Sequence, residues 1–117
     1  MLGVNFMDSN AYYPKLRRIA EEYGYDSQSR QCIEEMAELT QAINKFWRKD
    51  LKCGQLTTLE VPIGSPQELS IIEEIADVEI CIAQMKYLLA IRDEDINKVI
   101  EQKLDRQLER IEKCTNS

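Results

Sequence analysis

The sequence predicts an all-α subunit of the four-helix-bundle type, and three observations support this fold class. Apolar residues recur at helical spacing over most of the chain, while glycine and proline fall mainly between these stretches or at their ends. Only one connection between the periodic stretches is longer than a tight turn. The length of 117 residues fits a single domain, which we expect to cover residues 1–117. Helices joined mainly by short connections are typical of α-helical bundles.

The first two predicted helices are separated by a glycine. One helix should begin near Tyr13 and Pro14, because proline is tolerated at the first helical position. Gly24 should end it, and the following YDSQS stretch should form a polar turn that caps the next helix. We expect the second helix over about Gln28–Lys49. Its predicted apolar face consists of Ile33, Met36, Leu39, Ile43, Phe46 and Trp47.

A loop insertion over residues 50–68 comes next, and its LTTLEV segment has the composition of a short strand. The third helix should cover about Pro66–Ile91, with Ser65 as its N-terminal cap. A tight RDED turn then leads to a fourth helix over about Asp95–Lys113. The apolar residues expected to face the core are Ile71, Ile75, Val78, Ile82, Met85 and Leu89 on the third helix, and Ile96, Val99, Ile100, Leu104, Leu108 and Ile111 on the fourth.

The composition argues against several classes of function. A net charge of −6 does not suit a nucleic-acid-binding protein with a broad basic face, and no apolar run reaches membrane-spanning length. The lack of histidine excludes Ser-His-Asp and Cys-His catalysis, as well as a Glu-x-x-His di-iron site. The four cysteines lack the spacing of zinc ligands, and we find no signal-peptide pattern. We therefore expect a protein of the reducing cytoplasm.

Two of the helices carry carboxylates on or beside their apolar faces. Successive residues of a helix advance by about 100°, which places Glu35 at the edge of the apolar face and Glu38 one turn further along. On the third helix, Glu74 points into the apolar face and Asp77 lies at its flank. A carboxylate directed into a core is costly unless it is paired, protonated or bound to a metal ion.

The fourth helix supplies opposite charge, because Lys103, Gln107 and Arg110 line up at the edge of its apolar face. Ion pairs from Glu74 to Lys103 or Arg110 would satisfy the inward charge without any ligand. Four carboxylates would still outnumber two cations. Since oxygen ligands without histidine or thiolate suit hard cations, we interpret the acidic residues as a site for Mg²⁺, with Mn²⁺ as the alternative.

These residues resemble the signature of the MazG-like, all-α nucleoside triphosphate pyrophosphohydrolases, in which a Glu-Glu-x-x-Glu helix precedes a Glu-x-x-Asp helix. Here the two motifs read EEMAE (Glu34–Glu38) and EIAD (Glu74–Asp77). The similarity extends over about residues 23–49 and 69–111, and it includes KLDRQLER in the fourth helix. The 35 residues between the motifs exceed the usual gap of the family, and Gln107 stands where asparagine is expected.

The resemblance implies Mg²⁺-dependent hydrolysis of an NTP or dNTP to the monophosphate and pyrophosphate, a reaction that suits house-cleaning of non-standard nucleotides. The implied metal ligands are Glu35, Glu38, Glu74 and Asp77. Glu38 is also our candidate for orienting or deprotonating the attacking water. The positions that match substrate-binding residues are Lys103, Gln107 and Arg110. Trp47 and Arg48 could stack on the base, or Trp47 could belong to the core and Arg48 to the solvated surface.

The resemblance also implies a homodimer or homotetramer, because fold and site in this family are built between chains. The loop at residues 50–68 would then be a substrate lid or an oligomer arm. Two other functions stay open: a non-catalytic nucleotide- and metal-binding regulatory module of the same fold, and a structural helical protein whose inward charges pair internally. A divalent cation should stabilise the folded protein in the first two cases and not in the third.

Overall fold

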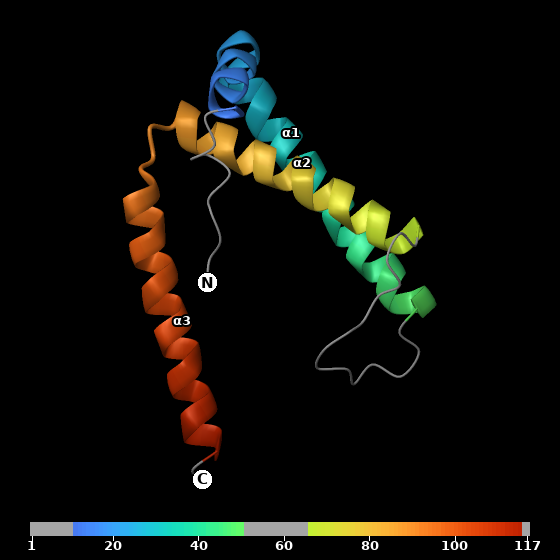
Figure 1. Ribbon diagram of the computed structural model, residues 1–117, viewed down its shortest axis with the longest axis vertical. Coiled ribbons are helices and arrows are strands. Elements are labelled where there is room, and N and C mark those ends of the chain that lie inside the picture. The colour runs from blue at the N-terminus through green and yellow to red at the C-terminus, as the bar shows by residue number, and fades with distance from the viewer. Residues whose placement is uncertain (1–10, 51–65, 116–117) are drawn as a thin grey trace.

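The computed structural model describes residues 11–50 and 66–115, and the all-α prediction is confirmed for this part of the chain. Three helices are present, α1 (Tyr13–Asp50), α2 (Pro66–Leu88) and α3 (Asp93–Thr115), as Figure 1 shows. The side chains of residues 47–50 and 66–68 lie outside the described residues, and so do the predicted strand, the cap at Ser65 and the rest of the loop insertion. The predictions for Trp47 and Arg48 therefore stay predictions.

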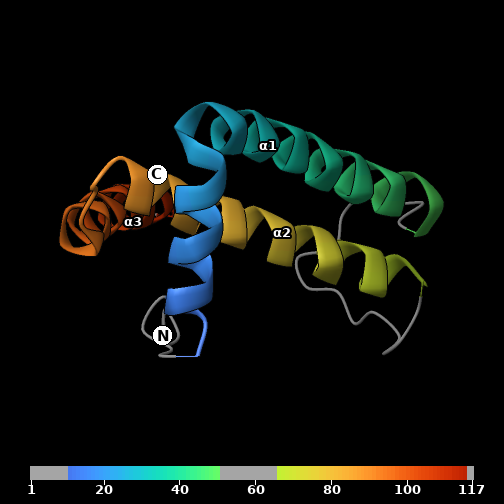
Figure 2. The same ribbon diagram turned by 90° about the horizontal axis from the view of Figure 1, so that it is seen from above.

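A bend at Gly24 takes the place of the turn that was expected between the first two helices. Gly24 has φ 80° and ψ 173°, a conformation that glycine adopts readily because it has no Cβ. The YDSQS segment that follows is helical, and the Ser29 hydroxyl donates a hydrogen bond to the Asp26 carbonyl at 3.1 Å. The two predicted helices are thus two arms of α1, and Figure 2 shows the first arm running across the direction of the second.

The second arm of α1 and α2 lie side by side and antiparallel (Figure 1). The buried residues of the described part are small or polar rather than large and apolar, apart from Leu16. Between the two helices, the Gln28 amide donates a hydrogen bond to the Gln84 side-chain oxygen at 2.6 Å, with both side chains buried. The first arm closes one end of this pair, where the Tyr13 and Tyr87 rings meet edge to face at 6.3 Å.

The predicted apolar faces are only partly buried. On α1, the side turned to α2 carries Cys32, Glu35, Leu39, Ala42 and Phe46, which are buried or half-buried. The apolar residues that were predicted as core but are exposed are Ile33, Met36 and Ile43 on α1, Ile75 and Ile82 on α2, and Leu89 directly after α2. One neighbouring helix covers a narrow stripe of a broad apolar face, so the remainder of each face stays open.

The connection from α2 to α3 is a short turn with defined backbone hydrogen bonds. The Ile91 amide donates to the Lys86 carbonyl at 2.9 Å, and the Ala90 amide donates to the Tyr87 carbonyl at 3.2 Å. This pair of bonds is a Schellman motif, in which Ala90 takes the left-handed position with φ 55°. α2 therefore ends before the predicted Ile91, and α3 begins at Asp93, which forms a 2.7 Å ion pair with Lys86.

The third helix, α3, extends away from the α1–α2 pair, as Figure 1 shows. None of its residues is buried, although Ile96 and Ile100 are half-buried near its start. The prediction that its apolar side lies in the core is therefore wrong for the single chain, because Leu104, Leu108 and Ile111 are 45–61% exposed. The described residues form three helices, so the four-helix bundle is not confirmed. No described helix combines the length and apolar character that a membrane span needs.

Replacing Ala90 by glycine should stabilise the protein. A left-handed conformation costs an alanine about 1 kcal/mol that glycine avoids, so we expect the melting temperature to rise by about 2–6 °C. The matched control is Ala37→Gly in the exposed interior of α1, which should lower the melting temperature by a similar amount. If both variants lost stability, the described end of α2 would be incorrect.

Candidate metal centre

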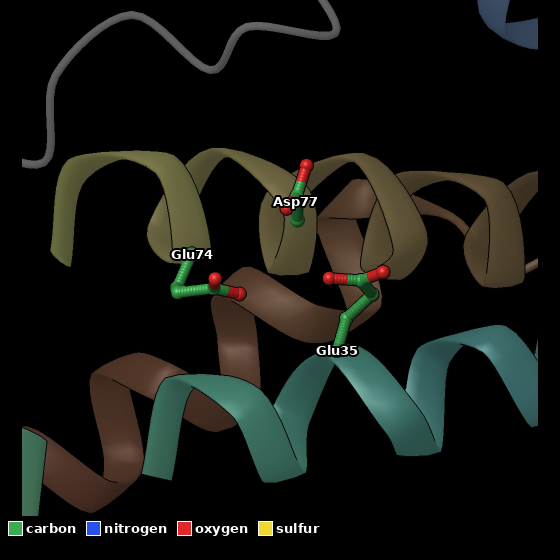
Figure 3. A group of neighbouring side chains, drawn as sticks. All are labelled: Glu35, Glu74 and Asp77. Carbon is green, nitrogen blue, oxygen red and sulfur yellow. The ribbon is translucent and has the colours of Figure 1, made fainter. Parts of the chain in front are cut away.

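Three acidic side chains meet between α1 and α2. Glu35 of α1 and the pair Glu74 and Asp77 of α2 each place one carboxylate oxygen within 4.8 Å of the others. We call these three residues the carboxylate cluster. The spacing of three residues puts Glu74 and Asp77 on adjacent turns of one side of α2, and Figure 3 shows Glu35 reaching toward them from α1. The structure thus brings together three of the four predicted metal ligands.

The cluster is one of three polar layers along the contact between the helices. Since the helices are antiparallel, the residue one turn earlier on α1 faces the residue one turn later on α2. The two buried cysteines lie between the glutamine hydrogen bond and the carboxylate cluster. There they face one another across the contact between the helices. From the cluster toward the Gly24 bend, the layers are Glu35 with Glu74 and Asp77, Cys32 with Cys81, and Gln28 with Gln84.

The cysteine layer consists of two thiols that are protonated near neutral pH when no metal is bound. Burial raises the pKa of the Cys32 thiol, and burial together with the nearby Cys32, Glu35 and Asp77 raises the pKa of Cys81 to about 11. Metal ligation by cysteine requires the thiolate, and both thiols stay protonated near pH 7. The donors that remain at this place are carboxylate oxygens, which favour a hard cation.

Two oxygens of the cluster have no hydrogen-bonding partner. Glu35 Oε2 and Glu74 Oε2 are buried, and no described group donates a hydrogen bond to either. The other oxygen of Glu35, Oε1, accepts a hydrogen bond from the Gln31 side-chain amide at 2.5 Å. A buried and unsatisfied carboxylate oxygen is costly, and a bound cation removes that cost.

The pKa of Glu35 is raised above its ordinary value, chiefly because burial disfavours the charged form. The hydrogen bond from Gln31 lowers this pKa, while the negative charges of Glu38 and Asp77 raise it further. Since these causes include no cation, negative charge is crowded at this place among the residues that the structure describes. Indeed, no ion pair in the described part of the chain reaches the cluster. The internal ion pairs considered for Glu74 are therefore not formed within the chain.

The remaining predicted site residues lie outside the cluster. Glu38 is exposed one turn beyond Glu35, close enough for its charge to act on that carboxylate. Lys103, Gln107 and Arg110 are exposed on α3, which leads away from the α1–α2 pair (Figure 1). One residue that the sequence interpretation missed is Gln31, whose position four residues before Glu35 is the spacing at which helical side chains bond.

A hollow of about 510 Å³ lies elsewhere, beside the turn from α2 to α3. Its lining residues are Tyr13, Lys86, Tyr87, Ala90, Ile91, Arg92 and Asp93. The lining cations already have acidic partners, since Lys86 pairs with Asp93 at 2.7 Å and Arg92 with Asp95 at 3.4 Å. The lining therefore offers an anionic ligand no unpaired cation, and the carboxylate cluster is the better candidate site.

Comparison of the chain with models of known protein families, with curated proteins and with solved structures gives no match. The likeness to MazG-like enzymes thus rests on the sequence pattern alone, and the candidate site rests on the geometry of its three carboxylates.

In the absence of divalent cations, Glu35→Gln should stabilise the protein near neutral pH. Because the pKa of Glu35 is raised in the folded state, the wild-type protein loses stability as the pH rises through that pKa, and the amide cannot ionise. We expect the melting temperature of the variant to be higher by about 2–4 °C. Mg²⁺ should raise the melting temperature of the wild type and leave that of the variant nearly unchanged.

The control for this measurement is Glu34→Gln, which removes the same charge from an exposed neighbour on α1. It should preserve the response to Mg²⁺. A Glu35→Gln variant that is less stable than the wild type without metal would show that the Glu35 charge is already compensated.

Proposed function

We propose that this chain is a Mg²⁺-dependent nucleoside triphosphate pyrophosphohydrolase, which converts an NTP or dNTP and water into the monophosphate and pyrophosphate. The observation that carries the proposal is the meeting of three carboxylates from two helices, with buried oxygens of Glu35 and Glu74 lacking a partner. These residues and Asp77 occupy motif positions whose spacing resembles the family signature. The substrates would include non-standard nucleotides that must be removed from the precursor pool.

The donor set suits the proposed cation. Glu35, Glu74 and Asp77 offer hard oxygen ligands, and the neighbouring thiols of Cys32 and Cys81 are protonated. This combination favours Mg²⁺, with Mn²⁺ as the alternative, over a thiophilic metal. Mg²⁺ held there would supply neutralisation of the phosphate charge and a lowered pKa for water in the site.

Glu38 is the residue of this chain best placed to act on the attacking water. Its carboxylate is exposed and lies one helical turn from Glu35, so it stands at the border between the cluster and the solvent. From there it would orient the water or accept a proton from it, as carboxylates do in general base catalysis. With no histidine in the chain, such a role falls to a carboxylate.

The basic residues needed for the triphosphate would come from a second copy of the chain. Lys103 and Arg110 lie on α3, which extends away from the cluster of its own chain and presents an exposed apolar stripe. We propose that this stripe packs on the open apolar faces of α1 and α2 in a partner subunit. A homodimer or homotetramer of this kind completes a four-helix arrangement, with Lys103, Gln107 and Arg110 turned to the phosphates.

A non-catalytic regulatory module that binds nucleotide and metal is the second candidate function. The position of Glu38 favours this module. Glu38 is the proposed general base, and it does not belong to the carboxylate cluster that would hold the metal ion. Such a module would gain stability from Mg²⁺ and nucleotide without turning the nucleotide over.

Incubation with a panel of canonical and modified NTPs and dNTPs plus Mg²⁺ should yield the monophosphate and pyrophosphate, resolved by ion-exchange chromatography. Glu74→Gln should lower kcat/KM by at least about 100-fold, because even groups behind metal ligands contribute about 10–100-fold. The control Glu73→Gln changes an exposed neighbour on α2 and should keep full activity. Stabilisation by Mg²⁺ without any product would favour the regulatory module. If Mg²⁺ gave no stabilisation and no product formed, both functions would be rejected.

The wild-type protein should have the molecular mass of a dimer or tetramer when measured by size-exclusion chromatography with light scattering. Leu104→Asp places a charge in the apolar stripe of α3, so it should dissociate the oligomer and abolish hydrolysis. Gln102→Asp places the same charge on the opposite side of the helix and should change neither. A wild-type monomer that hydrolyses nucleotides would contradict the shared site.

A further inference from the structure

Gln31 makes a contact with the cluster that the proposed function does not use. Its side-chain amide donates a 2.5 Å hydrogen bond to Glu35 Oε1 across one turn of α1. Within the described part of the chain, Gln31 is the one side chain outside the cluster that donates a hydrogen bond to the three carboxylates. Gln31 itself is exposed, so its amide is not held there by burial in a core.

The hydrogen bond fixes the orientation of the Glu35 carboxylate. The terminal torsion of a glutamate is broad, so its carboxylate plane is poorly fixed without a partner. With Oε1 occupied by Gln31, Oε2 is the oxygen left without a partner, and it is buried. The hydrogen bond thus engages Oε1 and leaves Oε2 available to a ligand.

We infer that Gln31 is a positioning residue, which holds the Glu35 carboxylate with Oε2 turned toward the proposed cation. Gln31 acts through Glu35 and contacts neither the cation nor the nucleotide. The inference rests on the proposed metal centre, and it assigns a role to a residue outside the two acidic motifs. Groups that hold a metal ligand through a hydrogen bond typically contribute about 10–100-fold to metal affinity.

The chain offers a matched control for Gln31. Gln41 is an exposed glutamine on the same arm of α1, and it forms no described hydrogen bond. Pairs of exposed side chains four residues apart contribute little to helix stability, so loss of the Gln31 bond should leave the fold intact. An effect confined to Gln31 would therefore report on the position of Glu35 and not on the helix.

The test is calorimetric titration of the wild type and Gln31→Met with Mg²⁺ alone, because methionine keeps the length of the side chain and removes the donor. We expect the Kd for Mg²⁺ to rise about 10-fold in Gln31→Met and to stay unchanged in Gln41→Met. At saturating Mg²⁺, kcat should remain within about twofold of the wild type, because the lost contact affects metal binding.

The outcomes separate this inference from the proposed function. Wild-type binding of Mg²⁺ that is unaffected by Gln31→Met would overturn the positioning role and leave the metal centre standing. Absence of Mg²⁺ binding in the wild type would overturn both.

Discussion

The antiparallel contact between α1 and α2 is the constraint on which the rest of the structure depends. The residues buried in this contact are few and mostly small, so apolar area alone defines its register weakly. The hydrogen bond between the buried Gln28 and Gln84 side chains fixes the register of the two helices more firmly. A shift by one turn would leave both amides buried and unpaired. The same register places Glu35 opposite Glu74 and Asp77, so the alignment of the helices and the candidate site have one cause.

The carboxylate cluster is held together at an electrostatic cost. Burial raises the pKa of Glu35, the charges of Glu38 and Asp77 raise it further, and no described cation pairs with the cluster. A chain that needed only stability would gain more from well-packed apolar side chains at this place. The cost is understandable if the cation that relieves it belongs to the function. Gln31 offsets part of the cost and at the same time leaves one oxygen available.

The chain leaves much of its apolar surface uncovered. Isoleucine and leucine side chains are exposed on all three helices, and α3 buries none of its residues. Association with another chain is a common way to cover such surfaces. The separation of Lys103 and Arg110 from the carboxylates of the same chain follows from the position of α3. Under the proposed function, a second subunit would cover the apolar stripe and supply positive charge for the triphosphate.

The sequence by itself determined the helical class, the break at Gly24, the start of a helix at Pro66 and the inward direction of Glu35 and Glu74. Each of these depends on local conformational preference or on helical periodicity, which the residues of one segment carry alone.

Only the tertiary structure decided which part of each broad apolar face is covered. It exposed Ile33 and Met36, placed Glu38 outside the cluster and left α3 unburied. Periodicity gives the direction of a side chain on its helix, whereas burial depends on where the neighbouring helix lies. That position is fixed by contacts between residues far apart in the chain, such as Gln28 and Gln84, which periodicity within either helix does not reveal.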